Sequence, residues 1–165
     1  MTISSEGTNA PVAVASVLLS VFVLAEVNYP FLTPQSQLAV FGGLGLVLIF
    51  LQMGAAVYLR RLAALAAGLA FGFIAVQNES LFSGLWLDSR SLGERAGQEA
   101  TADYLIGLAI LLLVLEATRR TIGNTLPILA LLFIAYAAFG PYVPDGLFPH
   151  RGYGWDRIVS QTVLH

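Results

Sequence analysis

The sequence predicts an all-α integral membrane protein, a bundle of four to five transmembrane helices plus a C-terminal amphipathic helix. Of its 165 residues, 57% are hydrophobic and only 11% are charged, whereas a soluble domain usually has about 25% charged residues. The charges gather in short clusters between long uncharged segments. A helix that crosses the hydrocarbon core needs about 20 predominantly apolar residues. A charge near the bilayer centre costs roughly 3 kcal/mol or more, which accounts for the uncharged segments.

The composition also narrows the classes of function. The chain has no cysteine, which excludes disulfides and thiolate metal sites. All eight basic residues are arginine and the formal net charge is −2. This balance argues against a nucleic acid as the partner.

Five apolar segments are predicted to cross the membrane. They cover approximately residues 11–32, 38–59, 62–85, 102–118 and 124–142, after a polar N-terminal tail at residues 1–10 and before a tail at residues 144–165. The fourth is short, because its uncharged part is only Tyr104–Leu115, so it can span only with little tilt. In the fifth, Thr125 is expected to be the N-cap and Pro127 lies in the first turn, where its missing N–H is harmless.

The second span is expected to begin after a link at Thr33–Gln37 and to end at Arg60-Arg61. Its glycines would allow close approach by a neighbouring helix: Gly42, Gly43, Gly45 and Gly54.

Two arginine pairs predict the orientation of the chain. Arg60-Arg61 and Arg119-Arg120 follow the second and fourth spans in short loops, where the positive-inside rule has most force. With both pairs in the cytoplasm, the N-terminus is inside, and the acidic loop at Asp88–Asp103 and the C-terminus are outside.

The tail shows helical periodicity. Its apolar face is formed by Trp155, Ile158, Val159, Thr162 and Val163, and its polar face by Asp156, Arg157, Ser160 and Gln161. Such a helix is expected to lie on the membrane surface or against a partner.

Three carboxylates lie in or beside apolar segments. Glu26 and Glu79 are either members of a proton or cation relay or helix-end residues that reach the headgroup layer, and the second reading is favoured. For Glu116 a local ion pair is favoured over a transport role, because Arg119 and Arg120 follow at i+3 and i+4.

Catalysis is not expected of this chain. The two histidines, His150 and His165, lack a second ligand at a metal-binding spacing. No histidine lies in a span to activate a serine there, as a membrane hydrolase would require.

The stretch from Glu116 to Ile158 contains a series of motif residues: the segments Glu116–Gly123, Leu126–Ile128, Phe139–Tyr142 and His150–Tyr153, with Phe133, Tyr136, Arg157 and Ile158. In order and spacing they resemble the N-terminal membrane region of the fused permeases of tripartite ATP-independent periplasmic (TRAP) transporters, in the branch that works with TAXI-type binding proteins. The match covers about the last 45 residues, and the earlier spans match only in hydropathy and order.

The fused proteins continue into a large transport domain, whereas this sequence ends at His165. The resemblance therefore implies the separately encoded small subunit (DctQ-like), a multi-pass protein of the bacterial inner membrane without a cofactor of its own. It implies a large permease partner that binds sodium and substrate and moves as an elevator, while this chain is a fixed scaffold among the membrane lipids. A TAXI-type periplasmic protein would deliver an organic anion. Residues expected to have structural or partner-contact roles are Glu116, Arg119, Arg120, Gly123, Pro127, Tyr136, Gly140, Pro141, Tyr153, Trp155 and Arg157.

Two other classes of function remain open. One is the small subunit of another transporter, such as a tricarboxylate transporter of similar build, or a membrane assembly factor. The other is a small membrane enzyme or a self-sufficient channel, against which the lack of a histidine or polar stripe through the spans counts.

We expect single cysteines at positions 61 and 120 to be shielded from a membrane-impermeant maleimide in intact cells, and cysteines within residues 88–103 to be labelled. The natural chain has no cysteine, so the labelling reports one position at a time. Strong labelling at position 61 or 120 would overturn the orientation, because flanking arginines remain cytoplasmic.

Overall fold

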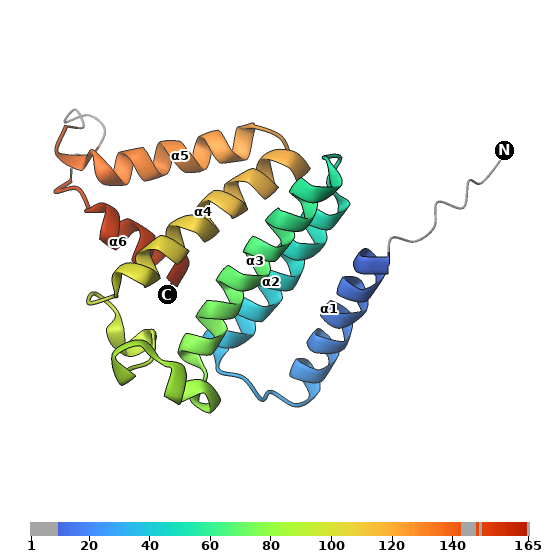
Figure 1. Ribbon diagram of the computed structural model, residues 1–165. Helices are drawn as coiled ribbons and strands as arrows, with labels where there is room; N and C mark the ends of the chain where they lie inside the picture. The colour runs from blue at the N-terminus through green and yellow to red at the C-terminus, as the bar shows by residue number, and fades with distance from the viewer. Residues whose placement is uncertain (1–9, 143–147, 149, 165) are drawn as a thin grey trace. The chain divides into compact units, whose positions relative to one another are not determined.

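The computed structural model describes residues 10–142, 148 and 150–164, and this part of the protein is helical and contains no strand (Figure 1). Four helices are long and apolar enough to cross a membrane: α1 (Ala10–Asn28), α2 (Pro34–Gln52), α3 (Val57–Asn78) and α4 (Thr101–Thr121). A shorter apolar helix, α5 (Thr125–Ala138), and the C-terminal helix α6 (Trp155–Val159) follow. The protein is thus an all-α, multi-pass membrane protein, as predicted.

The chain divides into two compact units, residues 1–75 and residues 76–165. The first holds α1, α2 and most of α3. The second holds the end of α3, the polar segment after it, α4, α5 and α6. Residues 1–9 of the predicted N-terminal tail, residues 143–147 and 149, and His165 lie outside the described residues.

In the first unit, α2 begins four residues earlier than predicted. Thr33 is its N-cap, with an extended backbone, and its hydroxyl accepts a hydrogen bond from the N–H of Ser36 at 3.4 Å. Pro34 occupies the first helical position, where its missing N–H costs nothing. Most of the predicted link at Thr33–Gln37 is therefore helix. Ser36 is buried and donates a hydrogen bond to the carbonyl of Ala75 on α3 at 3.3 Å.

The second helix ends at Gln52, seven residues before the predicted end, because Met53 adopts an extended conformation. The prediction that Arg60-Arg61 lies in a loop is therefore wrong, since α3 begins at Val57 and includes both residues in its first turns. Arg60 donates a hydrogen bond to the carbonyl of Leu51 at 3.3 Å. It thereby satisfies one of the carbonyls that a helix leaves open at its C-terminus.

The four glycines of the predicted second span have different surroundings. A Cβ atom at Gly43 would lie 2.8 Å from Cβ of Phe71 on α3, and one at Gly42 would lie 2.9 Å from the ring of the same residue. Gly45 and Gly54 have no such neighbour within 4 Å. Gly42 and Gly43 therefore serve close packing, as expected, but the helix they contact belongs to this chain.

In the second unit, α3 ends at Asn78, before the predicted limit of residue 85. The polar segment that follows is built from short 3₁₀ turns: η1 (Ser80–Leu85), η2 (Leu87–Ser89) and η3 (Gly93–Arg95). The next helix, α4, has 21 residues and is longer than the predicted span at 102–118. It includes Arg119-Arg120, so the prediction that this pair lies in a loop is also wrong. The first turn of α4 forms because Asp103 accepts a hydrogen bond from the N–H of Ala100 at 2.8 Å.

Helix α5 is shorter than the predicted fifth span at 124–142. Its 14 residues extend about 21 Å, less than the roughly 30 Å of a hydrocarbon core. The N-cap position is Asn124 rather than Thr125, and Pro127 is buried in the first turn. In Figure 1 α5 runs beside α4 in the opposite direction.

The C-terminal helix packs on its own chain, which corrects the prediction of a face free for the membrane or a partner. After α6 the chain forms one π-helical turn, η6 (Ser160–Leu164). Val159 and Leu164 lie against Gly107 of α4, where a Cβ would be 2.7 Å from Val159 Cγ1. Ser160, placed on the polar face by the sequence, is buried, whereas Trp155 is 61% exposed.

We expect Gly43→Ala to lower the thermal stability of the purified protein, by about 1–3 kcal/mol, because the new methyl group overpacks the contact with Phe71. Gly45→Ala is the matched control, since it adds the same methyl group to the same helix where no atom lies within 4 Å. It should be neutral or slightly stabilising, because alanine favours helix over glycine by about 1 kcal/mol. Equal melting temperatures for the two variants would contradict this account of the packing.

Candidate functional site

The first group of motif residues lies at the C-terminal end of α4. Glu116 forms ion pairs with Arg119, at 2.8 Å, and with Arg120. All three side chains are part-exposed, so solvent screens the ion pairs and they add little to stability. The prediction of a local ion pair for Glu116 is confirmed.

Gly123 makes the turn from α4 to α5. Its φ of +103° is a conformation that L side chains rarely adopt. Its N–H donates to the carbonyl of Arg119 at 3.1 Å, which closes the last turn of α4. This is the usual role of a glycine just after a helix, and it explains the Arg-Arg-Thr-Ile-Gly pattern without a ligand.

The second group of motif residues lies at the C-terminal end of α5. Residues 150–153 fold back onto the last turn of this helix. The N–H of Tyr153 donates to the carbonyl of Ala137 at 2.9 Å, and the N–H of His150 donates to the carbonyl of Gly140 at 3.4 Å. Tyr136 in turn donates its hydroxyl to the carbonyl of Phe148 at 2.8 Å. The returning segment thus caps α5.

His150 is the centre of this cap. Its Nδ1 accepts a hydrogen bond from the N–H of Gly152 at 3.1 Å, so the ring hydrogen is on Nε2, which lies 3.1 Å from the carbonyl of Tyr136 and donates to it. The ring packs edge-on against Tyr136, with centroids 4.8 Å apart. A Cβ on Gly140 would collide with the imidazole, which explains the glycine of the Phe-Gly-Pro-Tyr motif.

Pro141, Tyr153 and Arg157 complete the cap. Gly152 has a φ of +73°, and a Cβ there would lie 2.8 Å from Cδ of Pro141. The guanidinium carbon of Arg157 lies 5.2 Å from the centroid of the Tyr153 ring, a cation–π arrangement. Of the other predicted residues, Pro127 is buried in the first turn of α5, and Trp155 is exposed.

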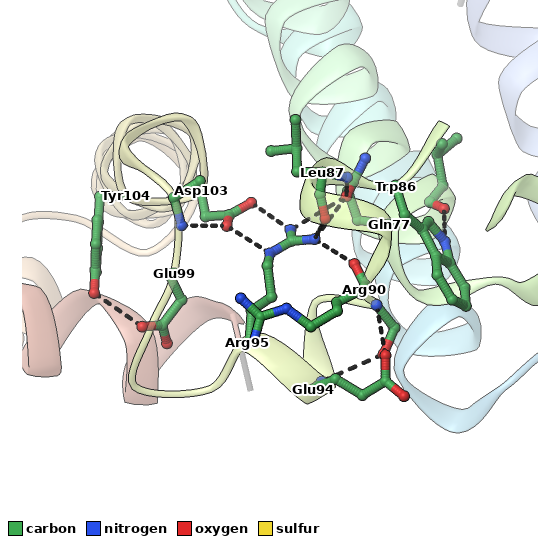
Figure 2. A network of polar contacts seen from close by, with 12 residues as sticks. Gln77, Trp86, Leu87, Arg90, Glu94, Arg95, Glu99, Asp103 and Tyr104 are labelled. Carbon is green, nitrogen blue, oxygen red and sulfur yellow. Dashed lines mark hydrogen bonds and ion pairs between the residues drawn. The ribbon is translucent and has the colours of Figure 1, made fainter. Parts of the chain in front are cut away.

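A buried polar network in the segment between α3 and α4 escaped the sequence analysis (Figure 2). Figure 2 shows the guanidinium of Arg95 between Asp103 and Gln77. Arg95 and Asp103 are both 0% exposed and form an ion pair at 2.9 Å. Arg95 also donates to the carbonyl of Leu87, at 2.9 Å, to that of Arg90, and to Oε1 of Gln77.

Gln77, near the end of α3, connects this network to the first 3₁₀ turns. Its Nε2 donates to the carbonyl of Leu85 at 2.9 Å, and its Oε1 accepts from the N–H of Leu87 at 3.0 Å. Trp86 donates its indole N–H to the carbonyl of Val76 at 3.0 Å. Hydrogen bonds thus hold the polar segment to the end of α3 and to the start of α4.

One sequence pattern could have predicted part of the hydrogen bonding in this segment. Ser91 and Glu94 have the Ser-x-x-Glu spacing of a capping box. The N–H of Ser91 does donate to Glu94 at 2.8 Å, and the N–H of Glu94 to the hydroxyl of Ser91 at 3.3 Å. The pairing of Arg95 with Asp103 has no comparable spacing rule.

Glu99 joins the polar segment to the C-terminal helix. It accepts hydrogen bonds from the hydroxyl of Tyr104 at 2.9 Å and from that of Ser160. Burial by itself would raise the pKa of the Glu99 carboxyl. The hydrogen bonds from Ser160, from the backbone at Glu99 and Gly97, and from Tyr104 outweigh burial and lower this pKa to about 2.

The two remaining carboxylates lie near helix ends, as predicted, but their side chains are covered by protein instead of reaching outward. Glu26 is 2% exposed and accepts a hydrogen bond from the N–H of Leu32 at 3.3 Å. Glu79 is 6% exposed. Neither structure nor sequence assigns either residue to a relay.

Chemically, the motif residues form two helix-terminal arrangements that satisfy backbone carbonyls. They place arginines at the C-terminal end of α4 and in α6. Among residues 10–142, 148 and 150–164, no three histidine or acidic side chains gather in a way that could hold a metal ion. Comparison with protein-family models, with curated proteins and with solved structures finds no match.

We expect Asp103→Asn to destabilise the protein by about 3–5 kcal/mol, because it leaves the guanidinium of Arg95 buried without a counter-charge. Thermal unfolding in detergent would measure this. Glu94→Gln, at an exposed carboxylate of the same segment, is the control and should shift stability by no more than about 0.5 kcal/mol. The double variant Arg95→Met, Asp103→Leu should recover part of the loss. An Asp103→Asn protein as stable as the control would contradict the network's role.

Glu99 should make stability depend on pH in the acidic range. Its pKa in the folded protein, about 2, lies below the ordinary value of 4.5. Its contribution is therefore fully present above pH 4.5 and is lost as the pH falls toward 2. Glu99→Gln should flatten the fall of the melting temperature across this window, whereas Glu94→Gln should retain it. An unchanged profile for Glu99→Gln would refute the assignment.

Proposed function

We propose that this chain is the non-catalytic small membrane subunit of a TRAP transporter, acting as a fixed scaffold beside a large, moving permease subunit. The complete system imports an organic anion in symport with sodium across the bacterial inner membrane. Sodium and substrate bind to the large subunit, and a TAXI-type periplasmic protein delivers the substrate.

The observation that carries this proposal is the way in which the motif residues interact. The segment at His150–Tyr153 contacts Tyr136 and Gly140, and Gly123 closes α4 next to the ion pairs of Glu116. The motif residues thus form structural contacts at the two ends of α5. In the second group the contact between Tyr136 and His150 joins motif residues that are 14 positions apart.

The charge distribution of the second unit supports the orientation expected from the positive-inside rule. Arg119 and Arg120 lie at the C-terminal end of α4. The polar segment, Glu99 and the C-terminal helix lie at its N-terminal end, where Ser160 contacts Glu99. We therefore place Arg119-Arg120 in the cytoplasm and both the Asp88–Asp103 segment and the C-terminus in the periplasm. The N-terminus is then cytoplasmic.

A scaffold needs helices held firmly to one another and an apolar exterior for lipid or partner helices. In the second unit, α6 is packed on α4 at Gly107, and α5 is capped by residues 150–153. Large apolar side chains on α5 are exposed, among them Ile128, Leu132 and Phe133 at 60–62%. These features suit a rigid element with an outer face that other membrane components cover.

We expect liposomes that contain this chain alone to show no substrate uptake under a sodium gradient. Liposomes with the chain, the large permease encoded beside it and the matching binding protein should accumulate substrate. The permease with binding protein but without this chain is the control, and it should be inactive or unstable. Uptake by this chain alone would refute the scaffold function.

Co-purification is the second readout. The tagged chain should retain the large permease in mild detergent. Failure to retain any large permease would contradict the proposal, and recovery of a tricarboxylate-type permease instead would replace the TRAP assignment with the related one.

A further inference from the structure

A groove of about 390 Å³ lies between α5 and the C-terminal helix. Its lining residues come from both elements: Phe133, Ile134, Ala137, Tyr153, Arg157, Ile158, Gln161 and Thr162. The volume is within the range of roughly 300–1,000 Å³ that is typical of ligand sites. A helix is about 10–12 Å wide, so this space would hold only about one turn of one. The groove therefore suits a narrow, flexible occupant.

The groove combines an apolar wall with one cation. Phe133, Ile134 and Ala137 form the side given by α5, and Ile158 faces them from α6. Arg157 is in the lining and takes part in none of the ion pairs found among the described residues. Its guanidinium is held over the ring of Tyr153. A guanidinium in this position retains the planar set of donors that binds phosphate.

With the start of α4 taken as the membrane surface, the groove lies near the boundary between lipid tails and headgroups. The C-terminal helix packs on α4 at Gly107, six residues after the helix begins at Thr101, which is about 9 Å along its axis. Interfacial helices lie about 5–10 Å deep in this boundary. An acyl chain could thus follow the apolar wall of α5 while its headgroup stays level with Arg157.

We propose that this groove is a binding site for one anionic phospholipid, with an acyl chain between Phe133, Ala137 and Ile158 and the phosphate on Arg157. The inference requires only that the chain is inserted in a membrane and does not depend on the scaffold function. The lipid fills the space between α5 and α6, and so fastens the C-terminal helix to the bundle.

Native mass spectrometry of the purified full chain, titrated with phosphatidylglycerol or phosphatidylcholine, tests the site. We expect one tightly bound phosphatidylglycerol per chain. Arg157→Gln should weaken this binding by about tenfold or more, as expected for loss of a charged hydrogen-bond donor. Phosphatidylcholine should bind more weakly from the start and lose less, because its choline cation offsets the charge of its phosphate. Arg157→Lys should retain part of the preference. Arg151→Gln, which removes a nearby arginine outside the groove, is the matched control and should bind like the natural protein.

The apolar part is tested by filling it. Ala137→Trp should reduce binding of both lipids by about tenfold, since the indole occupies the space of the acyl chain. In case this variant misfolds, Ile134→Cys provides an independent measurement in the cysteine-free chain. Phosphatidylglycerol should slow maleimide labelling of this cysteine by about tenfold with Arg157 present, and have little effect after Arg157→Gln.

Three results would overturn the proposal. The first is equal phosphatidylglycerol affinity for the Arg157→Gln and Arg151→Gln variants. The second is unprotected labelling at position 134 in saturating lipid. The third is an Ala137→Trp protein that keeps its lipid but loses the large permease, which would make the groove a protein contact.

Discussion

Polar groups at membrane depth must find their hydrogen-bond partners inside the protein, because the hydrocarbon region offers no water. The structure of the second unit depends on this constraint. Helix α5 is too short to reach from one headgroup layer to the other, so its last carbonyls would end in or near lipid. The segment at His150–Tyr153 returns to those carbonyls and donates hydrogen bonds to them. The motif residues His150–Tyr153 therefore satisfy the carbonyls at the end of α5.

The same constraint explains the segment between α3 and α4. A buried arginine is costly unless it is paired and its remaining donors are satisfied. Arg95 has Asp103 as its counter-charge, and Gln77 and two backbone carbonyls accept from its other N–H groups. The segment that is richest in charge is thus held to α3 and α4 by hydrogen bonds of its side chains. Its carboxylates hold the start of α4 and, through Glu99, the C-terminal helix.

The proposed scaffold function and the proposed lipid site are connected through α6. A fixed element beside a moving domain requires that its own helices do not shift, and the contact of Ser160 with Glu99 fastens only one side of the C-terminal helix. The groove lies on its other side, toward α5. A lipid there would complete the packing, whereas an empty groove would leave α6 held mainly by Gly107 and Glu99.

The sequence by itself determined the fold class and the approximate positions of the spans. Hydropathy and segment length are local properties, and they decide whether a helix can cross the bilayer. It also predicted the ion pairs of Glu116, since i+3 and i+4 neighbours meet on any helix. Helix ends were less predictable. The extended backbone of Thr33 and of Met53 sets the start and the end of α2, and hydropathy does not report backbone conformation.

Only the tertiary structure decided where the apolar face of the C-terminal helix packs. The helical periodicity predicts an apolar face, but it does not say whether lipid, a partner or α4 covers that face. Here α4 covers it, because Gly107 leaves space for Val159 and Leu164. The pairing of Arg95 with Asp103, and of Ser160 with Glu99 across 61 positions, likewise follows from how the chain folds back on itself. Such contacts join residues that have no fixed spacing in the sequence, so no local sequence pattern predicts them. Each contact stabilises the fold because both partners are buried together, and only the tertiary structure brings them together.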